Sequence, residues 1–248
     1  MADQADCRVS TSGDYEDTLS AIACVFAREF NLSVHGIYVL FHSNERAFES
    51  SLASANKFDA TYARQTATWA VALSTTERIF VNEAVLSRLP WPEQIRVLAH
   101  ELAHTAQYRL AGGRKSTSDQ WLREGVAEWM ASSIVDSLKL APLAKRKALA
   151  LARVSKAGRD GALPALHRMV TFYDFAALRS TLGNPATYDQ AFIAADFLIQ
   201  CCGLPSILQY FRLFGQSDDR LQNFRTAFGK DLSTFEDEFR LHVRGQYH

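Results

Sequence analysis

The feature that most constrains this chain is a pair of histidines, His100 and His104, that lie four residues apart inside a long helical pattern. Residues four apart lie on one face of an α-helix, about one turn from each other. Both imidazoles can therefore reach a single metal ion, and Glu101 projects beside them. In the H-E-x-x-H pattern the histidines bind zinc and the glutamate acts as a general base. The spacing predicts a metal-binding helix.

The residues around this motif also favour one long helix. Prolines at 90 and 92 suit a helix start, and the glycines at 112 and 113 suit a helix end. Apolar residues at helical spacing predict a buried stripe, formed by Ile95, Leu98, Leu102, Ala106 and Leu110. The two histidines lie off that stripe, so we expect them to face a cleft.

A second stretch, Trp121 to Trp129, offers the third ligand that a catalytic zinc usually takes from the protein. Glu124 lies twenty positions after His104, and a polar loop at 114–119 could turn the chain back so that a second, antiparallel helix returns the carboxylate. Gly125 would permit a close helix–helix approach. Glu128 is one turn further along the same face and could accept a hydrogen bond from a ligand histidine, which would fix its tautomer. The alternative is that Glu124 and Glu128 are solvated carboxylates on a helix surface.

The chain before the motif predicts a mixed α/β region. Apolar spacing predicts a helix over 15–30, and β-branched and aromatic residues predict a strand over 34–42. A cap at 43–46 would begin a helix that ends near residue 55. Two further strands are expected at 66–73 and 78–82, joined as a hairpin by 74–77.

The chain beyond residue 140 predicts only helices, over 142–156, 164–180, 186–202, 204–214 and 231–244. The expected fold class is therefore α+β. We predict an α/β lobe over 1–138, with a small mixed sheet and two metal-binding helices, and an all-α lobe over 139–248 that closes the cleft.

Composition excludes several classes of protein. The 27 basic and 27 acidic residues balance, so nothing indicates a nucleic-acid binder, and no segment approaches the roughly 20 apolar residues of a membrane span. The polar residues 1–17 lack an apolar signal core, so the chain is expected in the cytoplasm unless a leader has been removed. Cys201 and Cys202 are predicted to be buried, inert thiols, and a Cys7–Cys24 bridge is left open. The oligomeric state is left open.

The histidine motif and the stretch Trp121 to Ala127 resemble the gluzincin metallopeptidases, the clan of thermolysin and aminopeptidase N. The resemblance is closest to small bacterial proteins described as peptidase-MA-like. It covers about 79–135, and 188–203 resembles a later helix of those proteins. It implies a zincin-like fold in which His100, His104 and Glu124 bind one zinc ion, Glu101 is the base and Glu128 supports the ligands.

The same resemblance implies a tyrosine or histidine in the second lobe that stabilises the oxyanion of the reaction. Tyr188, at the start of a predicted helix, is our candidate, and Tyr173 and His167 are the runners-up; a packing tyrosine is the alternative. The glycine-containing Met-Glu-Asn segment by which aminopeptidases hold a free amine is not found upstream of His100. The expected activity is therefore that of an endopeptidase acting on a peptide or protein. Two alternatives stay open: a zinc hydrolase of a non-peptide or modified substrate, and a non-catalytic module that zinc braces.

Overall fold

The computed structural model describes residues 7–9, 14–56, 60–113 and 117–245, so part of the loop predicted at 114–119 lies outside the described residues. The chain is α+β and mostly helical, with one small mixed sheet. Its elements are α1 (Tyr15–Phe30), β1 (Tyr38–His42), α2 (Glu45–Asn56), α3 (Ala60–Ala67), β2 (Ala72–Ser74), β3 (Arg78–Asn82), α4 (Glu83–Leu86), α5 (Trp91–Leu110), α6 (Gln120–Ser137), α7 (Leu143–Arg159), the 3-10 turn η1 (Leu166–Arg168), α8 (Phe172–Leu182), η2 (Asn184–Ala186), α9 (Tyr188–Cys202), α10 (Leu204–Leu213), α11 (Arg220–Phe228) and α12 (Leu232–Arg244).

The sheet has the strand order β1-β3-β2, in which β1 runs parallel to β3 and β2 runs antiparallel to it. The short strand β2 is therefore an edge strand, and it packs beside α5. The predicted hairpin between the second and third strands is confirmed, with Leu73 opposite Phe80.

The strand predicted over 66–73 is wrong over 66–71, because α3 ends at Ala67 and β2 begins only at Ala72. Ala63 and Ala67 are four residues apart and are buried, together with Phe48 of α2 and Phe80 of β3, in a small cluster of their own. Burial of the helix face that carries Ala63 and Ala67 therefore favours a helix over the predicted strand at residues 66 and 67.

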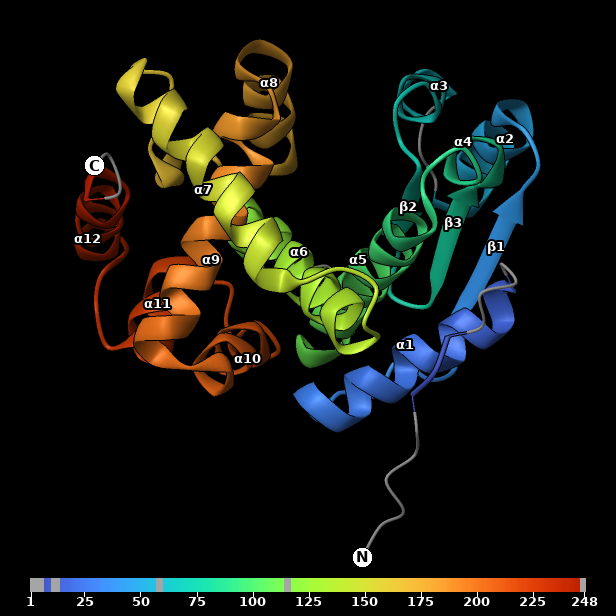
Figure 1. The fold of residues 1–248 in the computed structure, drawn as a ribbon, viewed down its shortest axis with the longest axis horizontal. Coiled ribbons are helices and arrows are strands. Elements are labelled where there is room, and N and C mark those ends of the chain that lie inside the picture. Colours follow the sequence, from blue (N-terminus) through green and yellow to red (C-terminus); the bar gives the residue numbers. More distant parts are fainter. Residues whose placement is uncertain (1–6, 10–13, 57–59, 114–116, 246–248) are drawn as a thin grey trace, which may run out of the picture.

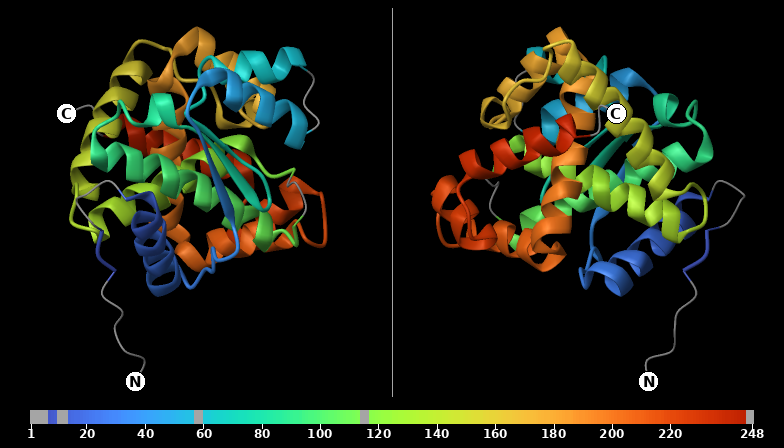
Figure 2. Two further views of the ribbon diagram at one scale, coloured as in Figure 1. Left: turned by 90° about the vertical axis from the view of Figure 1, so that its right-hand side faces the viewer. Right: turned by 60° about the vertical axis from the view of Figure 1, so that its left-hand side comes forward.

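The metal-motif helix α5 and its partner α6 lie at the centre of the molecule. Figures 1 and 2 show the sheet on one side of this pair and the helices α9 to α12 on the other. The predicted start of α5 is confirmed, because Pro90 caps the helix and Pro92 lies in its first turn, where a missing N–H costs nothing.

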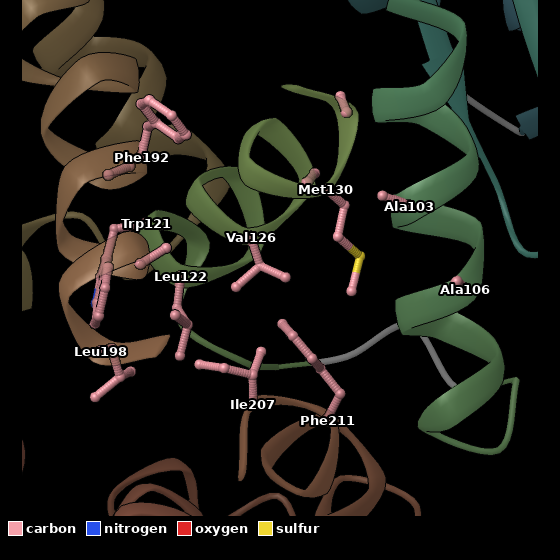
Figure 3. Close-up of a cluster of buried hydrophobic side chains, with 14 of the residues drawn as sticks. Ala103, Ala106, Trp121, Leu122, Val126, Met130, Phe192, Leu198, Ile207 and Phe211 are labelled. Carbon is pink, nitrogen blue, oxygen red and sulfur yellow. The ribbon is translucent and has the colours of Figure 1, made fainter. Parts of the chain in front are cut away.

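The main core fills the space between α5, α6, α9 and α10. Figure 3 shows Ala103 of α5, Val126 and Met130 of α6, and Ile207 and Phe211 of α10 directed into it, and all of these side chains are buried. This core also contains residues on both sides of position 138, so the two predicted lobes share one apolar interior. Packing on their apolar faces thus holds α5 and α6 in place.

The C-terminal region is helical as predicted, with α7, α9, α10 and α12 close to the expected ranges. The helix predicted over 164–180 is wrong over 164–171, where the chain forms only η1 and the carbonyls of Met169 and Val170 accept from the first N–H groups of α6; α8 begins at Phe172. The helix α11 was not predicted. Its two buried phenylalanines, Phe224 and Phe228, are four residues apart and join the core.

The cysteines differ from expectation. Cys7 and Cys24 form a disulfide bond, so the bridge that the sequence left open is present. The prediction of buried thiols at the end of α9 is wrong, since Cys201 is exposed and Cys202 is only half-buried. The reason is that this last turn of α9 directs Cys201 away from the core that covers the helix's other face.

Among the described residues, no single helix has the length and apolar character to span a membrane; a bent pair, Asn184–Cys202 with Leu204–Leu213, meets that test jointly on length and composition.

Candidate metal centre

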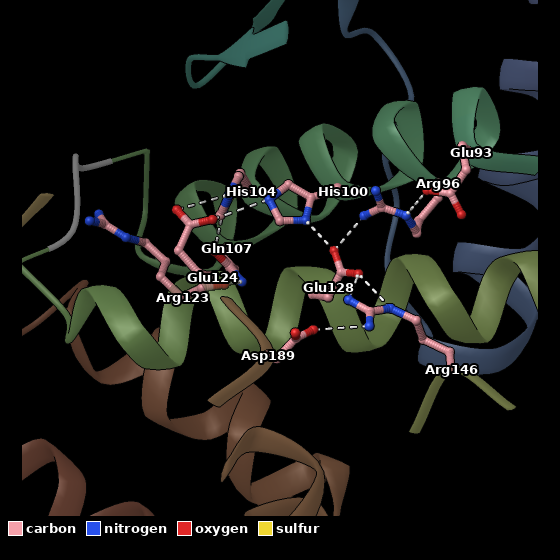
Figure 4. Close-up of polar contacts among 10 residues, drawn as sticks. All are labelled: Glu93, Arg96, His100, His104, Gln107, Arg123, Glu124, Glu128, Arg146 and Asp189. Atoms are coloured by element: carbon pink, nitrogen blue, oxygen red, sulfur yellow. Dashed lines mark hydrogen bonds and ion pairs between the residues drawn. The ribbon is translucent and has the colours of Figure 1, made fainter. Parts of the chain in front are cut away.

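Two antiparallel helices bring the predicted ligands together. Figure 4 shows His100 and His104 on α5 facing Glu124 and Glu128 on α6. The two imidazole rings lie edge to face with their centres 4.7 Å apart. Glu124 and Glu128 are 8% and 3% exposed, which excludes the alternative of solvated surface carboxylates.

The donor atoms are spaced as ligands of one ion would be. His100 Nε2 lies 3.3 Å from one carboxylate oxygen of Glu124, and His104 Nε2 lies 3.5 Å from the other. All three donors lie within 4.8 Å of one another, so this group could hold a metal ion. Tetrahedral zinc with bonds of about 2.0–2.1 Å requires neighbouring donors roughly 3.3 Å apart. The three residues therefore suit such an ion. Among the described residues no fourth protein ligand is grouped with them, so the fourth position is left to another ligand.

A glutamine that the sequence did not point to orients His104. The Nε2 group of Gln107 donates to the carbonyl of Arg123 at 2.9 Å, which directs its amide oxygen toward Nδ1 of His104 at 3.0 Å. An amide oxygen only accepts, so Nδ1 carries the proton and the Nε2 lone pair faces Glu124. A metal ion placed between this lone pair and the carboxylate oxygen would be bound by both.

His100 is oriented by Glu128. The Nδ1 atom of His100 lies 3.4 Å from a carboxylate oxygen of Glu128, which is an ion-pair distance, and the predicted hydrogen bond between them is not formed with regular geometry. Glu128 is itself held by Arg96 at 2.6 Å and by Arg146 at 3.0 Å. Arg146 also donates to Asp189 at the start of α9. Figure 4 shows this chain of ion pairs linking α5, α6, α7 and α9, which fixes the position of the ligand face.

The buried charges shift one another's pKa. Burial alone would lower the pKa of His100, but the neighbouring carboxylates of Glu124 and Glu128 raise it to about 10. Burial would raise the pKa of Glu124, yet His104 and His100 hold it well below its usual range. The pKa of Glu128 is also depressed, against burial, by Arg96, His100 and Arg146. Both carboxylates are therefore ionised and available to a cation.

Gly125 allows a close approach, but to a different helix from the one expected. A Cβ atom at this position would overlap the backbone carbonyl of Ala191. The close approach that the glycine permits is therefore between α6 and α9. This contact bears on the metal centre because α9 begins with Tyr188 and Asp189, and both residues line a cavity beside the ligands. Close packing at Gly125 fixes the distance between these residues and the metal ligands.

A cavity of about 580 Å³ opens beside the ligands. His100 and Glu101 line it from α5, residues 69–72 line it from the edge strand and the loop before it, and Tyr188 lines it from α9. Glu101 therefore lines the same cavity as His100, one of the three candidate ligands. Burial raises the pKa of Tyr188 well above its ordinary value, and Glu124 raises it further, so the phenol keeps its proton.

The two runners-up to Tyr188 lie elsewhere. Tyr173 is 74% exposed on α8, and His167 pairs with Glu236 of α12 at 2.8 Å. Neither lines the cavity. A further phenol near the ligands was missed: Tyr108, one turn after His104 on α5, has a pKa raised first by burial and then by Glu124 and Glu101. Its spacing of four from His104 was the available signal.

No protein-family model, no curated protein and no solved structure matches the chain.

Proposed function

We propose that the chain is a zinc-dependent peptidase with a zincin-like arrangement of α5, α6 and the edge strand, and that it hydrolyses internal peptide bonds. The observation that carries the proposal is the convergence of His100, His104 and Glu124 on one point, together with the cavity that His100 and Glu101 line. Three protein ligands with an open fourth position are typical of catalytic zinc, whereas structural zinc is enclosed by four.

The chain's own residues then have distinct roles. A bound zinc ion would polarise the scissile carbonyl and lower the pKa of a water molecule to about 7. Glu101 takes the proton of the attacking water and carries it to the leaving nitrogen. Gln107 and Glu128 keep the Nε2 atoms of His104 and His100 directed at the ion.

Tyr188 is the proposed donor to the oxyanion that develops on the scissile carbonyl. It lines the cavity that Glu101 also lines, and its raised pKa keeps the hydroxyl in the donating form. The hydrogen bond from a preorganised donor strengthens as negative charge develops on the carbonyl oxygen. Stabilisation of this kind accelerates acyl transfer.

The edge strand β2 is the proposed binding site for substrate backbone. Its only partner strand within the described chain is β3, and its first residue, Ala72, lines the cavity together with residues 69–71. An extended peptide can add to such an edge through main-chain hydrogen bonds. A peptide bound along a strand extends beyond the metal in both directions, which favours an endopeptidase.

The test compares the zinc-loaded wild-type chain with Glu101→Gln on a library of quenched fluorescent peptides, both N-blocked and unblocked. Loss of general-base catalysis should lower kcat by roughly 10²–10⁴-fold while zinc content is unchanged. Glu16→Gln, at an exposed position of α1, is the matched control and should retain full activity. Normal hydrolysis by a zinc-loaded Glu101→Gln chain, or zinc binding by wild type without cleavage of any peptide, would contradict the proposal.

A further inference from the structure

The cavity beside the metal group holds one arginine whose charge is not neutralised. Four arginines line it, and three of them contact carboxylates: Arg96 pairs with Glu93 and Glu128, Arg146 with Glu128 and Asp189, and Arg153 with Asp189. Arg179 of α8 has no carboxylate partner anywhere in 7–9, 14–56, 60–113 or 117–245.

Two aromatic rings hold the guanidinium of Arg179 in place. Its central carbon lies 4.8 Å from the ring centre of Trp69 and 5.6 Å from that of Tyr188. Trp69 comes from the loop before the edge strand, so the three side chains connect the sheet side of the cavity to α8 and α9. Rings that cover the face of a guanidinium leave its N–H edge free to donate.

The geometry points to Arg179 as a recognition residue for a carboxylate of the substrate. This inference rests on the proposed function, because the anionic groups that a peptide offers are carboxylates, either an Asp or Glu side chain or the free C-terminus. A guanidinium edge binds a carboxylate with two parallel hydrogen bonds, and a partly buried position strengthens them. The lining charges of the cavity favour the same ligand, since four arginines line it with three carboxylates, those of Glu101, Glu128 and Asp189.

Trp69 places this carboxylate relative to the scissile bond. It directly precedes residues 70–72, which line the cavity and lead into β2. A peptide paired along β2 therefore passes Arg179 a few residues from the bond that faces Glu101. Arg179 is thus a specificity residue, and it sets which residue of the substrate lies beside the metal.

The experiment measures binding rather than turnover, so that it is independent of the peptidase proposal. Zinc-loaded Glu101→Gln is titrated with N-acetylated, C-amidated hexa-alanine peptides that carry a single Glu at each position in turn. Each is compared with its Gln counterpart. Hexa-alanine with a free C-terminus is compared with its amide. Binding is followed by calorimetry and by tryptophan fluorescence, with Trp69→Phe identifying the reporting ring.

In one of these pairs the carboxylate peptide should bind roughly tenfold or more tightly than its amide counterpart, which is the scale of a charged hydrogen bond. The pair that shows the preference distinguishes a side-chain carboxylate from the C-terminus. Adding Arg179→Ala should abolish the preference, and Arg179→Lys should retain only part of it, because a lysine lacks the two-pronged edge. Arg212→Ala, at an exposed position of α10, is the control and should leave the preference intact.

Three results would overturn the inference: equal binding of acid and amide in every pair, no measurable binding of any peptide, or an equal loss for both members of a pair in Arg179→Ala. The last result is what a purely structural role in bracing the two sides of the cavity gives. The peptidase proposal is tested separately: it fails if the zinc-loaded wild type hydrolyses no peptide.

Discussion

The role given to Gln107 can be tested by replacing it with methionine, which has a similar shape and no amide. The side chain is 1% exposed and makes two hydrogen bonds, one with His104 and one with the carbonyl of Arg123. At about 0.5–1.5 kcal/mol each, their loss should lower the free energy of unfolding of the metal-free chain by about 1–3 kcal/mol. His104 also loses the acceptor that fixes its tautomer, so zinc affinity should fall roughly 10–100-fold.

Gln94→Met is the matched control on the same helix. Gln94 is also buried and makes two hydrogen bonds, accepting from Tyr15 at 2.8 Å and donating to the carbonyl of Leu89 at 2.8 Å. Its replacement should cost similar stability but leave zinc affinity unchanged, because none of its partners binds the ion.

The two quantities are measured independently. Urea unfolding of the metal-free chains gives stability, and competition with a chromophoric chelator gives the zinc dissociation constant. If Gln107→Met and Gln94→Met bind zinc equally tightly, the argument that the glutamine fixes the tautomer of His104 is wrong. If only Gln107→Met loses affinity while both lose stability, the orienting role is established.

Three further results are expected. Gly125→Ala should destabilise the chain by about 1–3 kcal/mol in urea unfolding, because its Cβ overlaps the carbonyl of Ala191; unchanged stability would mean that the two helices separate freely. Asp119→Ala should cost about 3–5 kcal/mol in the same assay, since it leaves the partly buried Arg220 without the carboxylate that it contacts at 2.6 Å. The pKa of His100 is raised to about 10, so its stabilising contribution to the metal-free chain is complete below about pH 6.5 and lost as pH rises through 10. Zinc binding near neutral pH should displace about one proton from this residue, and its affinity should rise about tenfold per pH unit; calorimetry in buffers of different ionisation enthalpy that detects no proton release would contradict this.

The elements predicted most closely are those whose sequence pattern agrees with their packing. The helix α1 has the predicted bounds because Ile22, Phe26 and Phe30 recur at helical spacing and all three are buried. The ligand helices were predictable for a second reason: a four-residue spacing fixes which side chains share a face before any packing is known.

What the sequence did not predict depends on contacts between distant segments. The partners of Glu128 lie 32 residues before it, at Arg96, and 18 residues after it, at Arg146, and no local pattern links them. The start of the strand predicted over 66–73 belongs instead to the end of α3, because Ala63 and Ala67 are buried on one helix face together with Phe80 of β3. The orienting role of Gln107 depends on a backbone carbonyl of another helix, which a sequence does not display.

The most direct test of the whole account is the metal content of the purified chain after removal of all metal and reloading with zinc. We predict one tightly bound zinc ion per chain in the wild type, and none in His100→Ala or Glu124→Ala, each checked for folding by circular dichroism. A folded wild-type chain that binds no zinc, or a Glu124→Ala chain that binds it as tightly as wild type, would contradict the convergence of these three side chains on one ion.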